Sequence, residues 1–131
     1  MNILIGSNMS MGLNKIINMI DDFSNQRDWS QFHSPKNLAV SISIEANELL
    51  ECFQWTDPSV KAVDDDAELR QKIQDELADV LIYALRSCSV LGFDPLEVIN
   101  KKLRVNEQKY PVHLSKGTSS KYDKLSPDDV K

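Results

Sequence analysis

The sequence predicts an all-α fold built from four helices. Apolar residues recur three and four positions apart along nearly the whole chain, which is the spacing of one helix face. A polar residue followed by proline marks a helix start at Ser34 and at Asp94, and Gly92 marks a helix end. No segment alternates apolar and polar residues as a half-buried strand would. The 131 residues, of which 41% are hydrophobic and 27% charged, are enough for one soluble domain whose core needs no disulfide.

Two helices are predicted before an acidic connection. The first ends near Arg27, and its apolar stripe consists of Leu13, Ile16, Ile17 and Ile20. The second begins at Pro35 and runs to about Trp55, where Thr56, Asp57 and Pro58 end it. Its stripe consists of Leu38, Ile42, Ala46, Leu49 and Phe53. Residues 1–11 are interpreted as a ragged leader, because Met9 and Met11 could each be an alternative start.

Two further helices are predicted after the acidic connection at 60–66. The third spans about Ala67–Leu91, and its inward face consists of Leu69, Ile73, Leu77, Val80, Ala84, Leu85 and Cys88. The fourth runs from Pro95 to about Lys109, and Pro111 prevents it from continuing. Residues 12–110 are therefore expected to form the helical domain. Residues 111–131 contain few apolar side chains and are expected to be a basic, flexible C-terminal tail.

The charge of the chain is unevenly distributed. The formal net charge is −5, which argues against a general binder of nucleic-acid polymers or anionic membranes. Residues 1–100 carry 7 basic and 16 acidic side chains, whereas residues 101–124 carry 7 basic and 2 acidic ones. An acidic body is thus followed by a basic segment.

The sequence predicts a cytoplasmic protein. Cys52 and Cys88 lie in apolar helical segments and are expected to be reduced thiols rather than a disulfide. The longest apolar run, Val80–Leu85, is far too short to span a membrane. No basic residue precedes Lys15, so the N-terminus does not have the pattern of a signal peptide.

Two predicted helices carry the same acidic pattern. Glu45 and Glu48 lie three residues apart on one border of the second helix's apolar stripe, and Glu76 and Asp79 have the same placement on the third. If the helices pack through their stripes, four carboxylates converge. Converging carboxylates repel one another and need protons, basic groups or cations, and a site rich in oxygen suits Mg²⁺ or Mn²⁺.

Two other interpretations of these acids stay open. Pairs of acids three apart are common on solvated helix faces that bind nothing. A ferritin-like di-iron site is disfavoured, because it needs a histidine three residues after a glutamate and neither His33 nor His113 has that spacing.

The residues around these pairs resemble the MazG-like nucleotide pyrophosphohydrolases, and most closely their small single-domain branch that includes the dCTP pyrophosphatases. The likeness rests on Ile44–Leu49, Phe53–Trp55 and Asp75–Tyr83. It continues upstream through Arg27–His33 and downstream through Lys102, Asn106, Lys109–Pro111, Lys116–Gly117 and Lys121–Tyr122, so that it covers about residues 13–125. One departure concerns subtype: Ile44 stands where many members have a glutamate before Glu45.

The resemblance implies a four-helix MazG-like bundle that assembles as a dimer or tetramer. It also implies hydrolysis of a (deoxy)nucleoside triphosphate between the α and β phosphates, with dCTP-like nucleotides as expected substrates in house-cleaning of the nucleotide pool. By this resemblance Glu45, Glu48, Glu76 and Asp79 are the expected Mg²⁺ ligands, and Glu48 is the expected catalytic residue that orients or deprotonates water.

The resemblance also implies residues that bind the nucleotide. Trp29 and Trp55 are expected to sandwich the base, with His33 nearby; without the family likeness both tryptophans would be interpreted as packing residues. The other expected contacts are Tyr83, Lys102, Asn106, Lys109, Lys116, Lys121 and Tyr122. Two alternative functions stay open: a dUTP- or phosphoribosyl-ATP-type pyrophosphohydrolase, and a non-catalytic helical interaction module.

Overall fold

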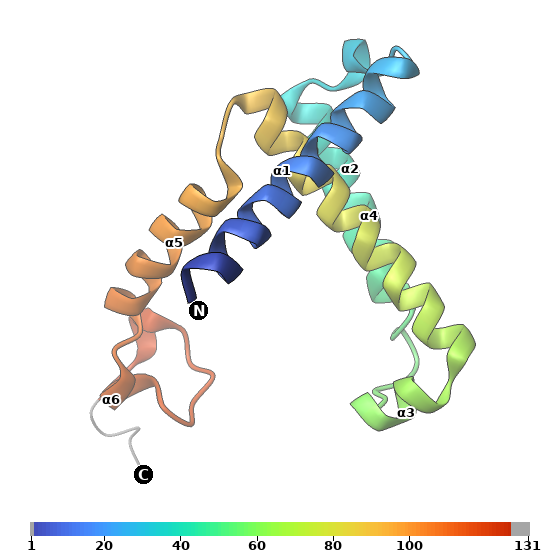
Figure 1. Cartoon of the computed structure of the whole chain (residues 1–131). Coiled ribbons are helices and arrows are strands. Elements are labelled where there is room, and N and C mark those ends of the chain that lie inside the picture. The colour runs from blue at the N-terminus through green and yellow to red at the C-terminus, as the bar shows by residue number, and fades with distance from the viewer. Residues whose placement is uncertain (1, 127–131) are drawn as a thin grey trace. The chain divides into compact units, whose positions relative to one another are not determined.

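The computed structural model describes the backbone of residues 2–126 and the side chains of residues 12–126. Every regular element in this part of the chain is helical, which confirms the all-α prediction (Figure 1). The chain divides into two compact units, Met1–Phe93 and Asp94–Lys131, and each is described separately below. No helix in the described residues combines the length and the apolar character that crossing a membrane requires.

The first unit begins with two long helices joined by a tight connection. Helix α1 spans Asn2–Gln26, so its backbone continues back through the residues interpreted as a leader. The short 3-10 helix η1 (Ser30–Phe32) follows, and α2 spans Pro35–Glu51. The Ser34 side chain accepts a hydrogen bond from the backbone N–H of Asn37, which is the N-cap expected from the sequence.

Helix α2 ends four residues before the predicted limit at Trp55. Beyond Glu51 the backbone changes to i→i−3 bonds, from Cys52 N–H to the Leu49 carbonyl and from Phe53 N–H to the Leu50 carbonyl. Such bonds tighten the last turn of a helix and lead out of it. The helical spacing of apolar residues therefore continues to Phe53, past the residue at which the α-helical hydrogen bonds stop.

The acidic connection contains the short helix α3 (Val60–Asp65), and α4 spans Ala67–Leu91 as predicted. Asp66 caps α4 by accepting a hydrogen bond from the backbone N–H of Leu69. Gly92 ends α4 with φ 71°, a left-handed conformation that glycine adopts without steric cost.

Helix α4 is the centre of the first unit, because it contacts α1, α2 and α3, and its contact with α2 is the most extensive. The buried core is thin: among the described apolar side chains only Leu38 is fully buried. Many large apolar side chains on the three long helices stay exposed, among them Met19, Phe23, Leu50, Leu77 and Leu81.

The second unit contains α5 (Pro95–Lys109), α6 (Val112–Ser115) and the 3-10 helix η2 (Tyr122–Lys124). The Asp94 side chain caps α5 by accepting hydrogen bonds from the backbone N–H groups of Leu96 and Glu97. The segment predicted to be a tail contains α6 and η2, and Tyr122 packs edge-on against Tyr110 with ring centroids 6.1 Å apart. The second unit therefore includes α5 together with the segment predicted to be a tail.

Candidate metal and nucleotide site

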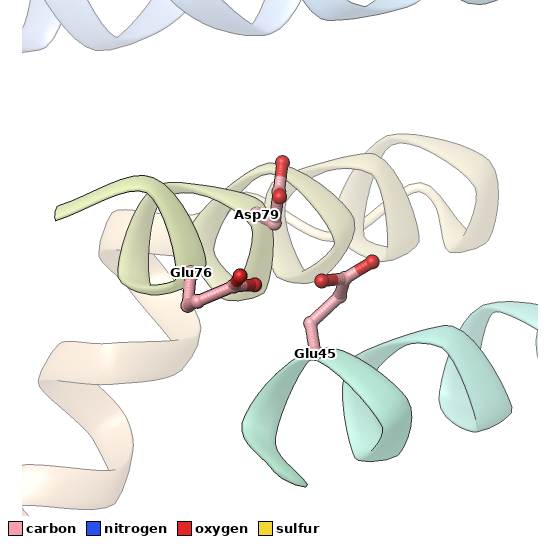
Figure 2. Close-up of side chains that lie close together, drawn as sticks. All are labelled: Glu45, Glu76 and Asp79. Atoms are coloured by element: carbon pink, nitrogen blue, oxygen red, sulfur yellow. The ribbon is translucent and has the colours of Figure 1, made fainter. Parts of the chain in front are cut away.

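Three carboxylates from two helices converge in the first unit. Glu45 on α2 and Glu76 and Asp79 on α4 each offer an oxygen atom, and these atoms lie within 4.8 Å of one another (Figure 2). The helices bring them together because α2 and α4 make the most extensive contact in the unit. Glu76 and Asp79 lie nearly one turn apart on α4 and therefore share a face.

Glu48 joins this group through its neighbours. Its side chain interacts with both Glu45 and Glu76, although it lies outside the trio whose oxygens are mutually close. We call Glu45, Glu48, Glu76 and Asp79 the carboxylate cluster. All four acids singled out from the sequence thus lie in one place; their role as ligands stays a prediction.

Two members of the carboxylate cluster, Glu45 and Glu76, hold their protons more tightly than isolated acids do. The pKa of Glu45 is raised to about 7, first by burial and then by a hydrogen bond with Glu48 and by the charges of Glu48, Asp79 and Glu76. Burial and Glu48 also raise the pKa of Glu76, and the nearby Lys72 partly opposes this effect. Ionisation of Glu45 and Glu76 therefore costs more free energy than ionisation of an isolated acid does.

Two buried oxygens of the cluster lack a hydrogen-bond partner in the described part of the chain. They are Oε2 of Glu45 and Oε2 of Glu76. Burying a carboxylate oxygen without a partner is unfavourable, so such atoms call for a cation or a proton. Hard carboxylate oxygens are the donors that Mg²⁺ and Mn²⁺ prefer, so the residues present fit a divalent cation.

A pocket of about 440 Å³ opens beside the cluster, and Asp79 is part of its lining. Its wall from α1 is mostly apolar and consists of Ile16, Met19, Ile20, Phe23 and Ser24. Trp29, His33 and Tyr83 also line it, and the same three residues line a neighbouring pocket of about 270 Å³. Three of the four aromatic contacts predicted in the first unit therefore line a cavity next to the carboxylate cluster.

Local structure holds Trp29 at this pocket. Asp28 adopts φ 55° to turn the chain after α1, and the backbone N–H of Trp29 then donates to the Ser24 carbonyl at 2.9 Å. The indole packs edge-on against Phe23, with ring centroids 5.6 Å apart. This contact fixes one edge of the indole while 42% of the residue stays exposed.

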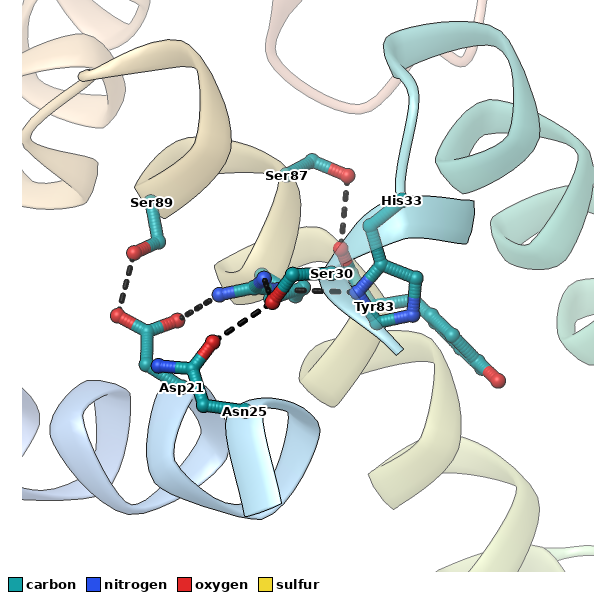
Figure 3. A network of polar contacts seen from close by, with 8 residues as sticks. Asp21, Asn25, Ser30, His33, Tyr83, Ser87 and Ser89 are labelled. Carbon is teal, nitrogen blue, oxygen red and sulfur yellow. Dashed lines mark hydrogen bonds and ion pairs between the residues drawn. The ribbon is translucent and has the colours of Figure 1, made fainter. Parts of the chain in front are cut away.

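Arg86 is a buried residue of α4 that lines the pocket, and it is not among the residues predicted from the sequence. Its guanidinium pairs with Asp21 on α1 at 2.6 Å and donates to His33 Nδ1 at 3.0 Å and to Ser30 Oγ at 3.1 Å (Figure 3). Ser89 Oγ also donates to Asp21. We call Arg86, Asp21, Ser30, His33 and Ser89 the arginine network.

A signal for Arg86 does exist in the sequence. Arg86 follows Asp79 by seven residues, Ile82 by four and Tyr83 by three, so all four share the pocket-facing side of α4. Its partner Asp21 lies 65 residues away in the sequence, and helical spacing alone cannot pair residues on different helices.

The structure does not bring Trp55 to the pocket that Trp29 lines. Trp55 follows α2 and is 87% exposed, and its part in a sandwich of two tryptophans stays a prediction. The remaining predicted contacts belong to the second unit: Lys102, Asn106, Lys109, Lys116, Lys121 and Tyr122. Within that unit the Lys109 ammonium lies 4.7 Å from the centroid of the Tyr122 ring. The role of these residues in nucleotide binding stays a prediction.

Comparison with known proteins decides the family. Residues 40–125 match the MazG-like family, and this segment includes the whole carboxylate cluster. The chain belongs to the MazG-like family. The family resemblance inferred from the sequence is therefore confirmed.

Named relatives of this MazG-like chain are pyrophosphatases. The chain is 40% identical to dCTP pyrophosphatase 1 of Mus musculus over 107 residues, which are 79% of this chain and 62% of that protein. It is also 40% identical to dCTP pyrophosphatase 1 of Homo sapiens over 106 residues, with the same shares of the two chains. The match thus spans less than two thirds of these relatives' length.

A solved structure supports the fold. The crystal structure of a pyrophosphatase from Archaeoglobus fulgidus superimposes with a TM-score of 0.66 at 42% sequence identity. The similarity covers 76% of this chain and 93% of that one.

Proposed function

We propose that this MazG-like protein hydrolyses (deoxy)nucleoside triphosphates to monophosphate and pyrophosphate, with dCTP-like nucleotides as substrates in house-cleaning of the nucleotide pool. The observation that carries the proposal is the carboxylate cluster of α2 and α4 beside a pocket lined by Trp29, His33 and Tyr83. The dCTP pyrophosphatases among the relatives support the same substrate class. We further propose that the protein acts in the cytoplasm.

In this proposal Glu45, Glu48, Glu76 and Asp79 hold Mg²⁺, with Mn²⁺ as a possible substitute. A bound divalent cation supplies neutralisation and positioning of the phosphate oxygens. The two partnerless oxygens of Glu45 and Glu76 support this assignment, because coordination would satisfy both atoms. Glu48 orients the attacking water and accepts its proton, since it contacts Glu45 and Glu76 without belonging to the trio whose oxygens are mutually close.

The base binds in the pocket and the phosphates reach towards the carboxylates. Trp29 offers an exposed aromatic face on which a base can stack, and Tyr83 lines the same pocket from α4. Trp55 provides the second stacking face, and Lys102, Asn106, Lys109, Lys116, Lys121 and Tyr122 contact the sugar and phosphates. We also propose that the chain forms a homodimer or homotetramer, because its three long helices in the first unit leave many large apolar side chains exposed.

One assay separates the candidate functions. The protein is incubated with each dNTP, with dUTP and with phosphoribosyl-ATP in the presence of Mg²⁺, and pyrophosphate release is followed. The proposal expects the highest kcat/KM for dCTP or a related pyrimidine nucleotide. Preference for dUTP or phosphoribosyl-ATP would assign a different substrate, and no release from any nucleotide would favour an interaction module.

The substitution Glu48→Gln tests the assigned catalytic role. The amide keeps the size of the side chain but cannot accept the proton, so turnover should fall by about 100-fold or more while nucleotide binding stays measurable. Turnover close to that of the unsubstituted protein would contradict the role of Glu48. Asp75→Asn removes an exposed acid of α4 that lies outside the carboxylate cluster, and it is the control for the loss of one acidic side chain.

A further inference from the structure

The arginine network determines which nitrogen of His33 carries its proton. Arg86 Nε donates to His33 Nδ1 at 3.0 Å, and a guanidinium can only donate because it stays protonated in proteins. Nδ1 is therefore an acceptor, and the neutral imidazole must carry its hydrogen on Nε2. Burial and the charge of Arg86 both lower the pKa of His33, which keeps the ring neutral.

Nε2 of His33 is free to donate to a ligand. The two ring nitrogens point in divergent directions, so Nε2 faces away from Arg86, on the side of the Tyr83 ring (Figure 3). Within the described residues, no side chain or carbonyl accepts a hydrogen bond from Nε2. His33 and Tyr83 line both pockets, so the donor is placed where a base would bind.

The network makes this placement rigid. Arg86 is buried, and its partner Asp21 is itself held by Ser89. A third bond, to Ser30 Oγ, ties Arg86 to the turn that carries Trp29, and Ser30 donates in turn to Asn25 on α1 at 2.6 Å. His33 and the turn that carries Trp29 are thus anchored to one guanidinium.

We propose that Arg86 is a positioning residue that fixes His33 as a hydrogen-bond donor towards the pocket, so that the protein selects bases presenting an acceptor, such as a pyrimidine carbonyl or ring nitrogen, at that point. This inference rests on the proposed function for its substrate, whereas the state of His33 is independent of it. Tyr83 and Asp79 are the other titratable groups of the pocket, and neither bonds to His33 in the described residues.

The test uses two variants that differ only at residue 86. Asp21→Asn keeps the Nε–H of Arg86, and Asp21→Asn with Arg86→Met removes it without leaving an unpaired buried acid. The tautomer of His33 is read by nitrogen-15 NMR of the full chain, with exposed His113 as the internal reference. The unsubstituted protein and Asp21→Asn should show hydrogen on Nε2, and the double variant should populate both tautomers.

Kinetics then test the effect on the base. Losing one hydrogen bond should raise the KM for dCTP in the double variant about three- to tenfold over Asp21→Asn, with kcat nearly unchanged. The increase should vanish with a difluorotoluene deoxynucleoside triphosphate, whose apolar base has the shape of a pyrimidine but no strong acceptor. It should also be small in a His33→Gln background, because the amide donates without help from Arg86.

Several results would overturn the inference. Hydrogen on Nδ1 in the unsubstituted protein would do so even if the double variant failed to fold. An Nε2 tautomer that persists without Arg86, or an equal rise in KM for the apolar analogue, would show that Arg86 has a structural role only. Absence of nucleotide hydrolysis in the unsubstituted protein would contradict the proposed function and leave the NMR result to stand by itself.

Discussion

At the scale of single residues, the carboxylate cluster combines poor solvation with like charge. Glu45 is the residue most affected, because burial and three neighbouring acids all disfavour its ionised form. The sequence could predict which acids face one another, since helical spacing fixes the face of each pair. It could not predict that the oxygens of Glu45, Glu76 and Asp79 lie closest together while Glu48 lies outside this trio, because those distances depend on how α2 packs against α4.

The raised pKa of Glu45 predicts a pH-dependent stability. The folded protein binds this proton more tightly than the unfolded chain, whose pKa is 4.5, so the contribution to folding is present at low pH and is lost as pH rises through about 7. Glu45→Gln imitates the protonated acid. Without metal, the variant should melt a few degrees above the unsubstituted protein at pH 8 and at nearly the same temperature at pH 5.

Mg²⁺ should offset the loss of stability that ionisation of Glu45 causes at high pH. It should raise the melting temperature of the unsubstituted protein at pH 8 and have little effect on Glu45→Gln, because binding to the folded state alone stabilises it. Equal stabilisation of both proteins by Mg²⁺ would show that Glu45 is not a ligand.

Trp55 offers a second test at this scale, because a side chain that is 87% exposed contributes little to folding of the chain. Trp55→Ala should change the free energy of unfolding by no more than about 0.5 kcal/mol. If Trp55 stacks on the base, the same substitution should raise the KM for dCTP by roughly fivefold or more. Chemical denaturation and steady-state kinetics measure the two effects, and an unchanged KM would remove Trp55 from the binding site.

At the scale of elements, the residues at the helix ends decided how closely the limits of each helix were predicted. Both limits of α4 were predicted correctly: Gly92 marks its end in the sequence, and Asp66 caps its start in the structure. The end of α2 was missed because Phe53 continues the apolar period into a segment with i→i−3 bonds. The arginine network was missed because it joins α1, η1 and α4, and no local pattern reports contacts between distant elements.

Gly92, the residue that ends α4, provides a prediction about stability. Its φ is 71°, and a Cβ atom added there would meet no described atom within 4 Å. Gly92→Ala should therefore destabilise the protein through backbone strain alone, by about 1 kcal/mol. Gly92→Asn should cost less, because asparagine tolerates this conformation better. Equal losses for both variants in chemical denaturation would point to a steric cause instead.

At the scale of the whole molecule, charge is divided between the two units. Residues 1–93 carry 7 basic and 14 acidic side chains, whereas residues 94–131 carry 8 basic and 6 acidic ones. The first unit contains the carboxylate cluster, which calls for cations, and most of the predicted phosphate contacts belong to the second. The net charge of −5 is thus the sum of an acidic first unit and a slightly basic second unit. Such a division is consistent with a protein that binds an anionic substrate through a metal and basic side chains.

This division predicts that lysines of the second unit act on the substrate and not on stability. Lys116→Gln with Lys121→Gln should raise the KM for dCTP several-fold, because each lost contact to a phosphate weakens binding, and should leave the melting temperature nearly unchanged. Lys101→Gln with Lys124→Gln removes the same charge from the same unit at positions without a predicted contact, and it should have a smaller effect on KM. The difference between the variants should shrink as salt is added, because exposed charges are screened. Equal effects of the two pairs would mean that net charge alone attracts the nucleotide, and no effect of either would assign phosphate binding to the first unit and its metal.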